Sequence, residues 1–367
     1  MTVISNFRKF GTIALLALAG CQYTLADDDY WAQYGDLPVP IQQGAQTLTF
    51  VDFHDGMLVA ELDGGLGEVS MPVNESMVQS LRLDIGVMRK AKEMIDTGNY
   101  EGALTLMRPK VYPLIKFHQV PELFTQLHVP VRALLNTLIS AEKYEEANSL
   151  LKRIQLDKSS IQYSEIGIRL MNAYISSKNF TAAAHIAQTL PVQAEYSPNI
   201  RFLIDAADAL RAAEQYEAVI PLYRAIENAV SSEVQINVRM WLAYCLVLAD
   251  RIEEASPMID SMVEPNPKDQ LFSLYKLLQG SREYRQKNYA QALDLLTRGF
   301  VRAQTSYIWV PEMLYLIGDC YARSKDLAAA RNVWTEVTML YPESPWAPRA
   351  ETSLAQLPKP EPEQAEN

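Results

Sequence analysis

One short phrase recurs along most of this chain, and its spacing restricts the folds that the sequence can adopt. It reads NYEGAL at 99, KYEEAN at 143, NFTAAA at 179, QYEAVI at 215, RIEEAS at 251, NYAQAL at 288 and DLAAAR at 326. Successive phrases are 44, 36, 36, 36, 37 and 38 residues apart. A regular period of this length is the sequence signature of a repeat protein, in which similar units stack along the chain.

The fifth position of every phrase is occupied by a small or slim residue. These residues are Ala103, Ala147, Ala183, Val219, Ala255, Ala292 and Ala330. A run with helical periodicity precedes each phrase, as in SEIGIRLMNAYISSK, and a second follows it, as in AAAHIAQTL. We therefore predict about seven helix-turn-helix repeats, in which the slim residue allows the second helix to approach the first closely.

The last repeat carries a specific pattern of residue types. It reads Leu314-x2-Ile317-Gly318-x2-Tyr321, then Ala330-x3-Trp334, then Pro342. This pattern resembles the tetratricopeptide (TPR) repeat, with leucine at the usual first tryptophan and tryptophan at the usual phenylalanine. The resemblance implies an all-α fold, a TPR-like α-solenoid over residues 74–357, in which SPWAPRAETSLAQL (344–357) forms a closing helix.

The start of the chain has the features of a secretory signal. Two basic residues precede an apolar segment at 10–20, whose 11 residues fall well short of the ~20 that a membrane-spanning helix needs. The sequence LAGC at 18–21 resembles the lipobox of bacterial lipoproteins. The resemblance implies cleavage of residues 1–20 and lipidation of Cys21 by a diacylglycerol and usually a further acyl chain such as palmitate. Gln22 favours the outer membrane, periplasmic side; the alternative is an ordinary signal peptide with an incidental cysteine.

Two segments of the chain are polar enough to be predicted as unstructured. Residues 21–45 contain DDD and two prolines in LPVP, and we expect a lipidated flexible linker there. Trp31 and Tyr34 are exceptions in it that can dock on the folded body or contact the lipid interface. Residues 358–367 form a Pro/Glu tail that we expect to be disordered.

Between the linker and the repeats, residues 46–73 are rich in β-forming residues. Asp55-Gly56 lies between two such runs, and this dipeptide is a strong hairpin signal. We predict a small three-stranded antiparallel β segment, with strands near 47–53, 57–62 and 66–72. Three strands are barely enough to be stable alone. The segment is therefore expected to pack on the first helices or on a partner.

The composition excludes some classes of partner. The formal net charge is −11, and no cluster of basic residues occurs. Nucleic acid and anionic lipid surfaces are both bound through clustered Lys and Arg, so neither is expected as the main partner. Apart from Cys21, the cysteines are Cys245 and Cys320, which lie in apolar helical surroundings and are expected to be buried and unbonded.

No motif for catalysis, nucleotide binding or metal binding is found. The sequence has no Gly-rich phosphate loop and no H-E-x-x-H. His118 and His128 would need further ligands to hold a metal, so we interpret them as surface or half-buried histidines. The Glu pairs at 145–146 and 253–254 begin second helices, where carboxylates interact favourably with the helix dipole. We therefore predict no enzyme, no metal site and no cofactor.

The helical period predicts which residues line the concave groove that stacked repeats form. The candidates are Arg132, Asn136, Asn172, Arg201, Asp208, Arg211, Met240, Tyr244, Tyr284, Arg285, Tyr315 and Asp319. The first three partly resemble the carboxylate clamp that some TPR proteins use on peptide C-termini. The alternative is a mixed polar groove that holds a helix or an extended segment.

The function predicted from these features is that of an adaptor. The repeats around YPESPWAPRA are similar to those of bacterial TPR lipoproteins, broadly the BAM-complex lipoprotein and the Tol–Pal coordinator. The resemblance implies a membrane-anchored scaffold that binds envelope proteins during outer-membrane assembly or maintenance. One alternative is a glycan- or peptidoglycan-binding lipoprotein that stacks sugars on Trp31, Trp309, Trp334 and Trp346. Another is an enzyme carried on the solenoid.

Overall fold

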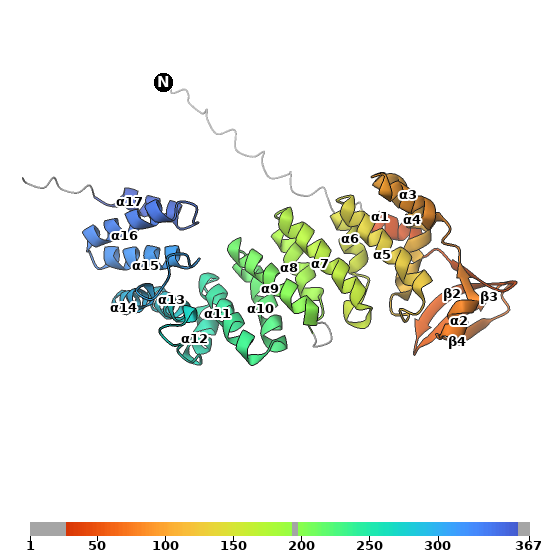
Figure 1. Cartoon of the computed structure of the whole chain (residues 1–367), viewed down its shortest axis with the longest axis horizontal. Helices are drawn as coiled ribbons and strands as arrows, with labels where there is room; N and C mark the ends of the chain where they lie inside the picture. The colour runs from red at the N-terminus through yellow and green to blue at the C-terminus, as the bar shows by residue number, and fades with distance from the viewer. Residues whose placement is uncertain (1–26, 193–196, 359–367) are drawn as a thin grey trace, which may run out of the picture. The chain divides into compact units, whose positions relative to one another are not determined.

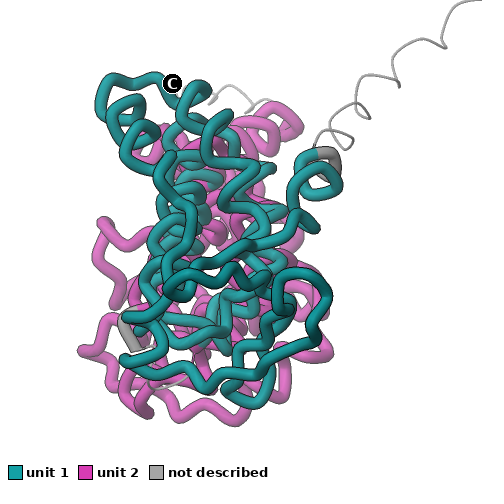
Figure 2. Tube along the Cα trace, turned by 90° about the vertical axis from the view of Figure 1, so that its right-hand side faces the viewer, with its two compact units in different colours: residues 1–174, 189–191 teal, residues 175–188, 192–367 magenta. Residues whose placement is uncertain are grey.

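The computed structural model describes residues 27–192 and 197–358. Within these ranges the chain forms 17 α-helices, two short 3-10 helices and five β-strands, most of which are labelled in Figure 1. It divides into two compact units, coloured in Figure 2: residues 1–174 with 189–191, and residues 175–188 with 192–367. The lipobox residues and the tail from 359 onward lie outside the described residues.

Unit 1 begins with a helix and an antiparallel sheet. The elements are α1 (Asp27–Tyr34), β1 (Val39–Gln43), β2 (Gln46–His54), β3 (Met57–Leu62), β4 (Glu68–Pro72), α2 (Glu75–Ser80) and β5 (Leu81–Leu83). The strand order is β4-β3-β2-β1-β5. The predicted three strands correspond to β2, β3 and β4, so the antiparallel β segment is confirmed but has five strands.

The two strands missed by the sequence prediction have weak local signals. β1 contains Pro40, which usually argues against a strand, and β5 is only three residues long. Pro40 is accommodated because the ladder between β1 and β5 ends at Ile41, so this part of β1 pairs with β2 alone. Because β5 lies within residues 74–357, the start predicted for the α-solenoid is wrong, and the helical repeats begin later, at Val87.

The linker predicted over 21–45 is also wrong for its described part, because residues 27–45 form α1, β1 and their connections. Trp31 and Tyr34 dock on the folded body, with their rings 6.3 and 6.0 Å from the ring of Tyr112. The guanidinium of Arg153 covers the Trp31 ring at 4.1 Å. These aromatic contacts order a segment whose average composition is polar.

One face of the sheet packs on the segment that connects the first two hairpins. The ring of Phe50 in β2 lies 5.7 Å from Phe117 and 6.0 Å from Phe124. Phe117 ends the 3-10 helix η1 (Tyr112–Phe117), which accounts for the longer first spacing between repeats. The second 3-10 helix, η2 (Leu156–Lys158), follows the second hairpin. The expectation that the sheet packs against the first helical elements is confirmed.

The helical repeats follow as seven pairs of helices in chain order and a closing helix. They are α3 (Val87–Asp96) with α4 (Tyr100–Val111), α5 (Thr125–Ser140) with α6 (Tyr144–Leu151), α7 (Ile161–Ser176) with α8 (Phe180–Thr189), α9 (Ser197–Ala212) with α10 (Tyr216–Ala229), α11 (Ser232–Leu248) with α12 (Ile252–Asp260), α13 (Gln270–Arg285) with α14 (Tyr289–Phe300), α15 (Val310–Arg323) with α16 (Leu327–Leu340), and α17 (Ala347–Gln356). All seven slim residues are at most 1% exposed. The prediction of an all-α, TPR-like repeat fold is confirmed.

The turn inside each hairpin contains one residue in the left-handed conformation, just before the residue that precedes the second helix. These residues, with φ between 58° and 77°, are Gly98, Glu142, Lys178, Glu214, Asp250, Lys287 and Lys325. In the first turn the amide of Gly98 donates to the carbonyl of Ile95, and the amide of Asn99 donates to that of Met94. This is the Schellman arrangement, which satisfies carbonyl groups that a helix end leaves free.

A buried ion pair joins the first two hairpins. Arg108 in α4 donates two hydrogen bonds, of 2.8 and 2.7 Å, to the carboxylate of Glu146 in α6, and Tyr112 donates a third of 2.5 Å. The Arg108 guanidinium also lies 4.1 Å from the Tyr30 ring in α1. Glu146 lies in the first turn of α6, as predicted, but it is only 5% exposed.

We expect Gly98→Ala to lower the free energy of unfolding of unit 1 by about 1 kcal/mol, because an L-residue with a Cβ is strained in the left-handed region. A Cβ at Gly98 would meet no atom within 4 Å, so the effect isolates backbone conformation. Lys287→Gly at the equivalent turn of another repeat is the matched control, expected to leave stability unchanged or raise it. Denaturant unfolding followed by circular dichroism measures both, and an equal loss in the two variants would contradict the interpretation.

Removal of one partner from the buried ion pair is expected to lower the free energy of unfolding of unit 1 strongly. Glu146→Ala leaves the Arg108 charge buried and unpaired, and should destabilise unit 1 by about 3 kcal/mol. Glu101 pairs with Lys143 at 2.8 Å on the surface, so Glu101→Ala should cost less than about 1 kcal/mol. Urea titrations compare the two variants, and similar costs would show that the burial of Glu146 has no energetic consequence.

Candidate functional site

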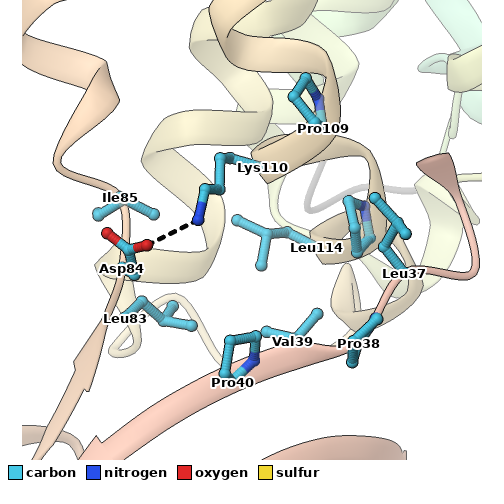
Figure 3. A pocket seen from close by; sticks show the side chains of 11 residues that line it. Leu37, Pro38, Val39, Pro40, Leu83, Asp84, Ile85, Pro109, Lys110 and Leu114 are labelled. Carbon is cyan, nitrogen blue, oxygen red and sulfur yellow. Dashed lines mark hydrogen bonds and ion pairs between the residues drawn. The ribbon is translucent and has the colours of Figure 1, made fainter.

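One cavity to be considered as a site lies in unit 1. It has a volume of about 320 Å³ and lies between the strands β1 and β5 and the segment of α4 and η1 (Figure 3). Its walls are prolines and aliphatic side chains. The two charged residues in its lining, Lys110 and Asp84, form an ion pair of 2.6 Å with each other. This cavity therefore offers apolar surface but no uncompensated charged group for recognition.

The second cavity lies in unit 2, on the face formed by the first helices of successive hairpins. There α11 contacts α13, α13 contacts α15, and α15 contacts α17. A cavity of about 240 Å³, called here the unit 2 cavity, is lined by residues of these four helices and by the residue that precedes α17. Its polar lining residues are Ser281, Arg285, Glu312 and Arg349, and its aromatic ones are Tyr284, Tyr315 and Trp346.

Glu312 is the most deeply buried charged residue of this cavity. It lies in the first turn of α15 and is 1% exposed. The hydroxyl of Tyr244 in α11 donates to Glu312 Oε2 at 2.6 Å. Burial raises the pKa of the Glu312 carboxyl to about 7, although the hydrogen bond from Tyr244 and the charges of Arg349 and Arg285 act in the opposite direction. The carboxyl thus changes its charge near neutral pH.

Ser281 contributes a second buried polar group without a complete set of partners. The residue is 4% exposed, and its Oγ has no hydrogen-bond partner. Three other buried side-chain atoms in the described residues share this property: Asn148 Oδ1, Ser164 Oγ and Arg239 Nε, but those residues do not line the unit 2 cavity. An unpaired buried hydroxyl is costly to leave unsatisfied. The Ser281 Oγ atom itself has less than 1 Å² of accessible surface, so it is not open to the cavity.

The two arginines of the cavity are half exposed at its rim, and each is already paired. Arg285 donates to Asp250 at 3.2 Å. Arg349 donates to Glu214 at 3.2 Å, and its guanidinium lies 4.3 Å from the ring of Trp346. The cationic rim is therefore compensated by carboxylates, whereas Glu312 has no cationic partner within hydrogen-bonding distance among the described residues.

Several of the predicted groove residues of unit 2 meet at or beside this cavity. Tyr284, Arg285 and Tyr315 line it, and Tyr244 contacts Glu312. Tyr284 also donates to Asp319 at 2.7 Å, which places Asp319 directly behind the wall.

Other predicted groove residues of unit 2 lie elsewhere. Arg211 is buried, stacks on Trp241 at 3.4 Å and donates to Asp208 at 2.9 Å. Arg201 lines a separate shallow hollow between α9 and α11. Met240 is wholly buried in the packing of α11, so the prediction that it lines a groove is wrong.

The predicted clamp residues of unit 1 are engaged with their neighbours. Arg132 donates to Glu122 at 2.6 Å, and Asn136 accepts a bond of 2.7 Å from Arg169. Asn172 also takes part in an interaction. A peptide carboxylate would have to displace Glu122 to reach Arg132.

Ser281, Glu312 and Arg349 were not predicted as site residues, and Trp346 was predicted only as a residue that stacks on sugars. The available signal was Glu312 itself, a single acid in the apolar run WVPEMLYLI.

The histidines and cysteines occupy structural positions. His128 contacts the hydroxyl of Tyr163 at 3.0 Å and the carbonyl of Val120 at 2.8 Å, and it is 1% exposed. His118 is also buried, so the expectation of surface or half-buried histidines is wrong. Cys245 and Cys320 are buried and free, as predicted. No group of three or more His, Cys, Asp or Glu within 27–192 and 197–358 is placed to hold a metal.

Comparisons with known proteins give only distant likenesses. No protein-family model matches the chain, and no curated protein matches its sequence. A solved structure of Pseudomonas aeruginosa pilF matches with a TM-score of 0.36 and 13% identity, over 60% of this chain and 95% of that one. The structure of Naa15/Naa10 bound to HypK-THB matches with a TM-score of 0.36 and 15% identity, over 74% of this chain and 39% of that one. At these values neither structure indicates what this chain binds.

The burial of Glu312 predicts how stability depends on pH. The folded state holds a proton more tightly than the unfolded state, whose carboxyl has the ordinary pKa of 4.5. The free energy of unfolding should therefore fall as pH rises from about 4.5 to about 7, by about 3 kcal/mol in total. Glu312→Gln lacks this loss, so it should be more stable than the natural protein at pH 8 and similar to it at pH 4.

Denaturant titrations at the two pH values measure this difference, with the exposed Glu343→Gln as the matched control. If the stability difference between Glu312→Gln and the natural protein were the same at pH 4 and pH 8, the assignment of a raised pKa to Glu312 would be incorrect.

Proposed function

We propose that this protein is a membrane-anchored TPR-like lipoprotein that acts as an adaptor, binding another protein in the cell envelope at the periplasmic side of the outer membrane. The observation that carries the proposal is the unit 2 cavity, where first helices of successive repeats and α17 place three aromatic side chains beside two arginines. Stacked helical repeats characteristically offer such surfaces to protein partners.

The anchoring part of the proposal is supported by the lipobox-like sequence LAGC at 18–21. Within the described residues, none of the helices has the length and apolar character needed to cross a membrane. Two or three acyl chains on Cys21 would hold the protein stably at a bilayer, since each buried methylene contributes ~0.8 kcal/mol. Anchoring raises the effective concentration of the binding surface near membrane-bound partners.

The glycan-binding alternative receives less support, because the tryptophans that would stack on sugars are covered. Trp309, Trp334 and Trp346 are 4%, 3% and 9% exposed. The half-buried Trp31 lies beneath the guanidinium of Arg153. A sugar ring needs an open aromatic face, so a protein partner is the better proposal.

The adaptor proposal is tested by crosslinking the full-length protein in cells, recovering it from solubilised membranes and identifying bound proteins by mass spectrometry. Arg285→Ala/Arg349→Ala, which alters the rim of the unit 2 cavity, is expected to lose the partner. Arg224→Ala on the second helix α10 removes a comparably exposed arginine and is the matched control that should retain it. Recovery of no protein with the natural chain, or equal recovery with both variants, would count against an adaptor that uses this cavity.

The anchoring proposal has its own test. Cys21→Ala should move the protein from the membrane fraction to the soluble fraction, measured by fractionation and immunoblotting. Continued retention at the membrane would mean that Cys21 is not the anchor.

A further inference from the structure

The cavity of unit 1, called here the unit 1 cavity, lies where the ladder between two strands of the sheet stops (Figure 3). β5 ends at Leu83, and its pairing with β1 ends at Ile41. Val39 and Pro40 of β1 therefore have no partner strand on the side of β5, and residues of α4 and η1 form the facing wall. The space of about 320 Å³ exists because the sheet ends here while the helical segment continues past it.

The lining of the unit 1 cavity is almost entirely hydrocarbon. Nine of its eleven residues are prolines or aliphatic residues, and Figure 3 shows Val39, Leu83 and Leu114 directed into the space. The four prolines have no backbone N–H to offer a ligand. The other two residues, Lys110 and Asp84, pair with each other at 2.6 Å, and their side chains are 40% and 68% exposed. This lining fits an uncharged apolar group, since it offers no charge that lacks a partner.

The volume of the unit 1 cavity distinguishes a long alkyl chain from an aliphatic side chain. If a methylene takes the ~30 Å³ that a water molecule occupies in the liquid, the cavity accommodates roughly ten methylenes. A leucine or isoleucine side chain would fill less than half of this space. A phospholipid would bring a charged phosphate, whereas Lys110 is already paired with Asp84. A fatty acyl chain joined through an uncharged ester or amide meets both conditions.

The protein itself carries such a group near the unit 1 cavity if Cys21 is acylated. The aromatic contacts of α1 with Tyr112 hold this helix against unit 1. After α1, Asp36 forms an ion pair of 2.7 Å with Lys116 of η1, directly before the lining residue Leu37. The first described helix is therefore fixed to the same part of unit 1 that contains the cavity.

The segment between Cys21 and α1 is long enough for the acyl group to reach the unit 1 cavity. Six residue steps separate Cys21 from Asp27, and an extended chain covers up to ~3.5 Å per step, or about 20 Å in total. Asp27 lies at most about 20 Å from Leu37, because α1 rises by ~1.5 Å per residue and only three residue steps follow it. Even if α1 points directly away from the cavity, Cys21 can return to it.

We propose that the unit 1 cavity binds one acyl chain of the protein's own Cys21 while the protein is not inserted in a membrane. This inference rests on the anchoring part of the proposed function. In a bilayer every acyl chain already lies in hydrocarbon, so the cavity is not needed there. In water an exposed acyl chain is unfavourable, and covering part of it reduces association of the lipoprotein through its lipid.

Photocrosslinking of the lipid tests the proposal directly. Cells that produce the full-length protein are fed a palmitate analogue with a diazirine in the middle of the chain. The protein is purified in neutral detergent, diluted below the critical micelle concentration and irradiated, and mass spectrometry locates the crosslinks. We expect crosslinks to Val39, Leu83 or Leu114, and their loss when phosphatidylcholine vesicles are added before irradiation. Crosslinks that lie elsewhere, or that vesicles do not reduce, would overturn the proposal.

A binding experiment measures the unit 1 cavity without its own lipid. The Cys21→Ala chain is titrated by calorimetry with acyl glycinamides from butanoyl to dodecanoyl. Affinity should rise about fourfold for each added methylene, the factor that burial of a methylene represents, and level off near ten carbon atoms. Decanoate should bind more weakly than decanoyl glycinamide, because its charge would have to compete with Asp84 for Lys110. Affinity that does not depend on chain length, or tighter binding of decanoate, would contradict the proposal.

Two variants in the Cys21→Ala background locate the binding. Leu37→Trp narrows the mouth of the unit 1 cavity and should weaken decanoyl glycinamide binding about tenfold. Leu123→Trp is the matched control, since both leucines are 40% exposed and Leu123 does not line the cavity. Ile85→Trp, at a half-buried lining position, is the second blocking variant, and circular dichroism verifies that each variant is folded. Unchanged binding in both blocking variants would mean that the acyl chain binds elsewhere.

The intact mass of the protein purified from membranes separates this inference from the proposed function. If the mass shows no acyl group, the anchoring proposal fails and this inference fails with it. If Cys21 is acylated but the crosslinks lie outside the unit 1 cavity, or the Cys21→Ala chain binds no acyl glycinamide, the anchoring proposal stands and this inference alone fails. Acylation together with crosslinks in the cavity supports both.

Discussion

The close approach of two helices in the hairpins that lie within one unit is the constraint on which the rest of this structure depends. In the last hairpins the two helices meet so closely that a Cβ on Gly280 would lie 2.6 Å from Leu296 Cγ, and one on Gly318 would lie 2.6 Å from Trp334 Nε1. The slim residues on the second helices, such as Ala292 and Ala330, are fully buried for the same reason. With the hairpin geometry fixed in this way, first helices contact first helices, and the unit 2 cavity forms along that contact.

Two buried glutamates show how differently the same side chain can be used. Glu146 receives three hydrogen bonds from Arg108 and Tyr112, and its charge is matched inside unit 1. Glu312 is at least as buried but receives only the bond from Tyr244 that is described above. A buried ion pair of the first kind belongs to the fold, because all of its groups are satisfied. A buried carboxyl with a raised pKa that lines a cavity is a candidate functional group.

The proposed recognition relies on a preformed site rather than on a large interface. Helices α11, α13, α15 and α17 hold the cavity walls, so little conformational entropy is lost when a partner binds there. A lipid anchor of the kind proposed for Cys21 would supply the local concentration that a small contact needs. In this proposal the repeats form the binding surface, and the N-terminal sequence, which resembles a lipoprotein signal, supplies the anchor.

The sequence by itself determined the parts of this protein that depend on neighbours close along the chain. The period of the phrase predicted the hairpins and the buried slim residues, and Asp55-Gly56 correctly marked the turn between β2 and β3. Only the tertiary structure decided the parts that depend on distant partners. The ordered segment 27–45 needs Tyr112, Glu146 needs Arg108 from 38 residues away, and Glu312 meets Tyr244 from 68 residues away. Met240 and Tyr244 lie one helical turn apart in α11. Met240 is part of the core, whereas Tyr244 contacts Glu312. The difference arises because the burial of a residue depends on what packs against its helix, which the helical period does not determine.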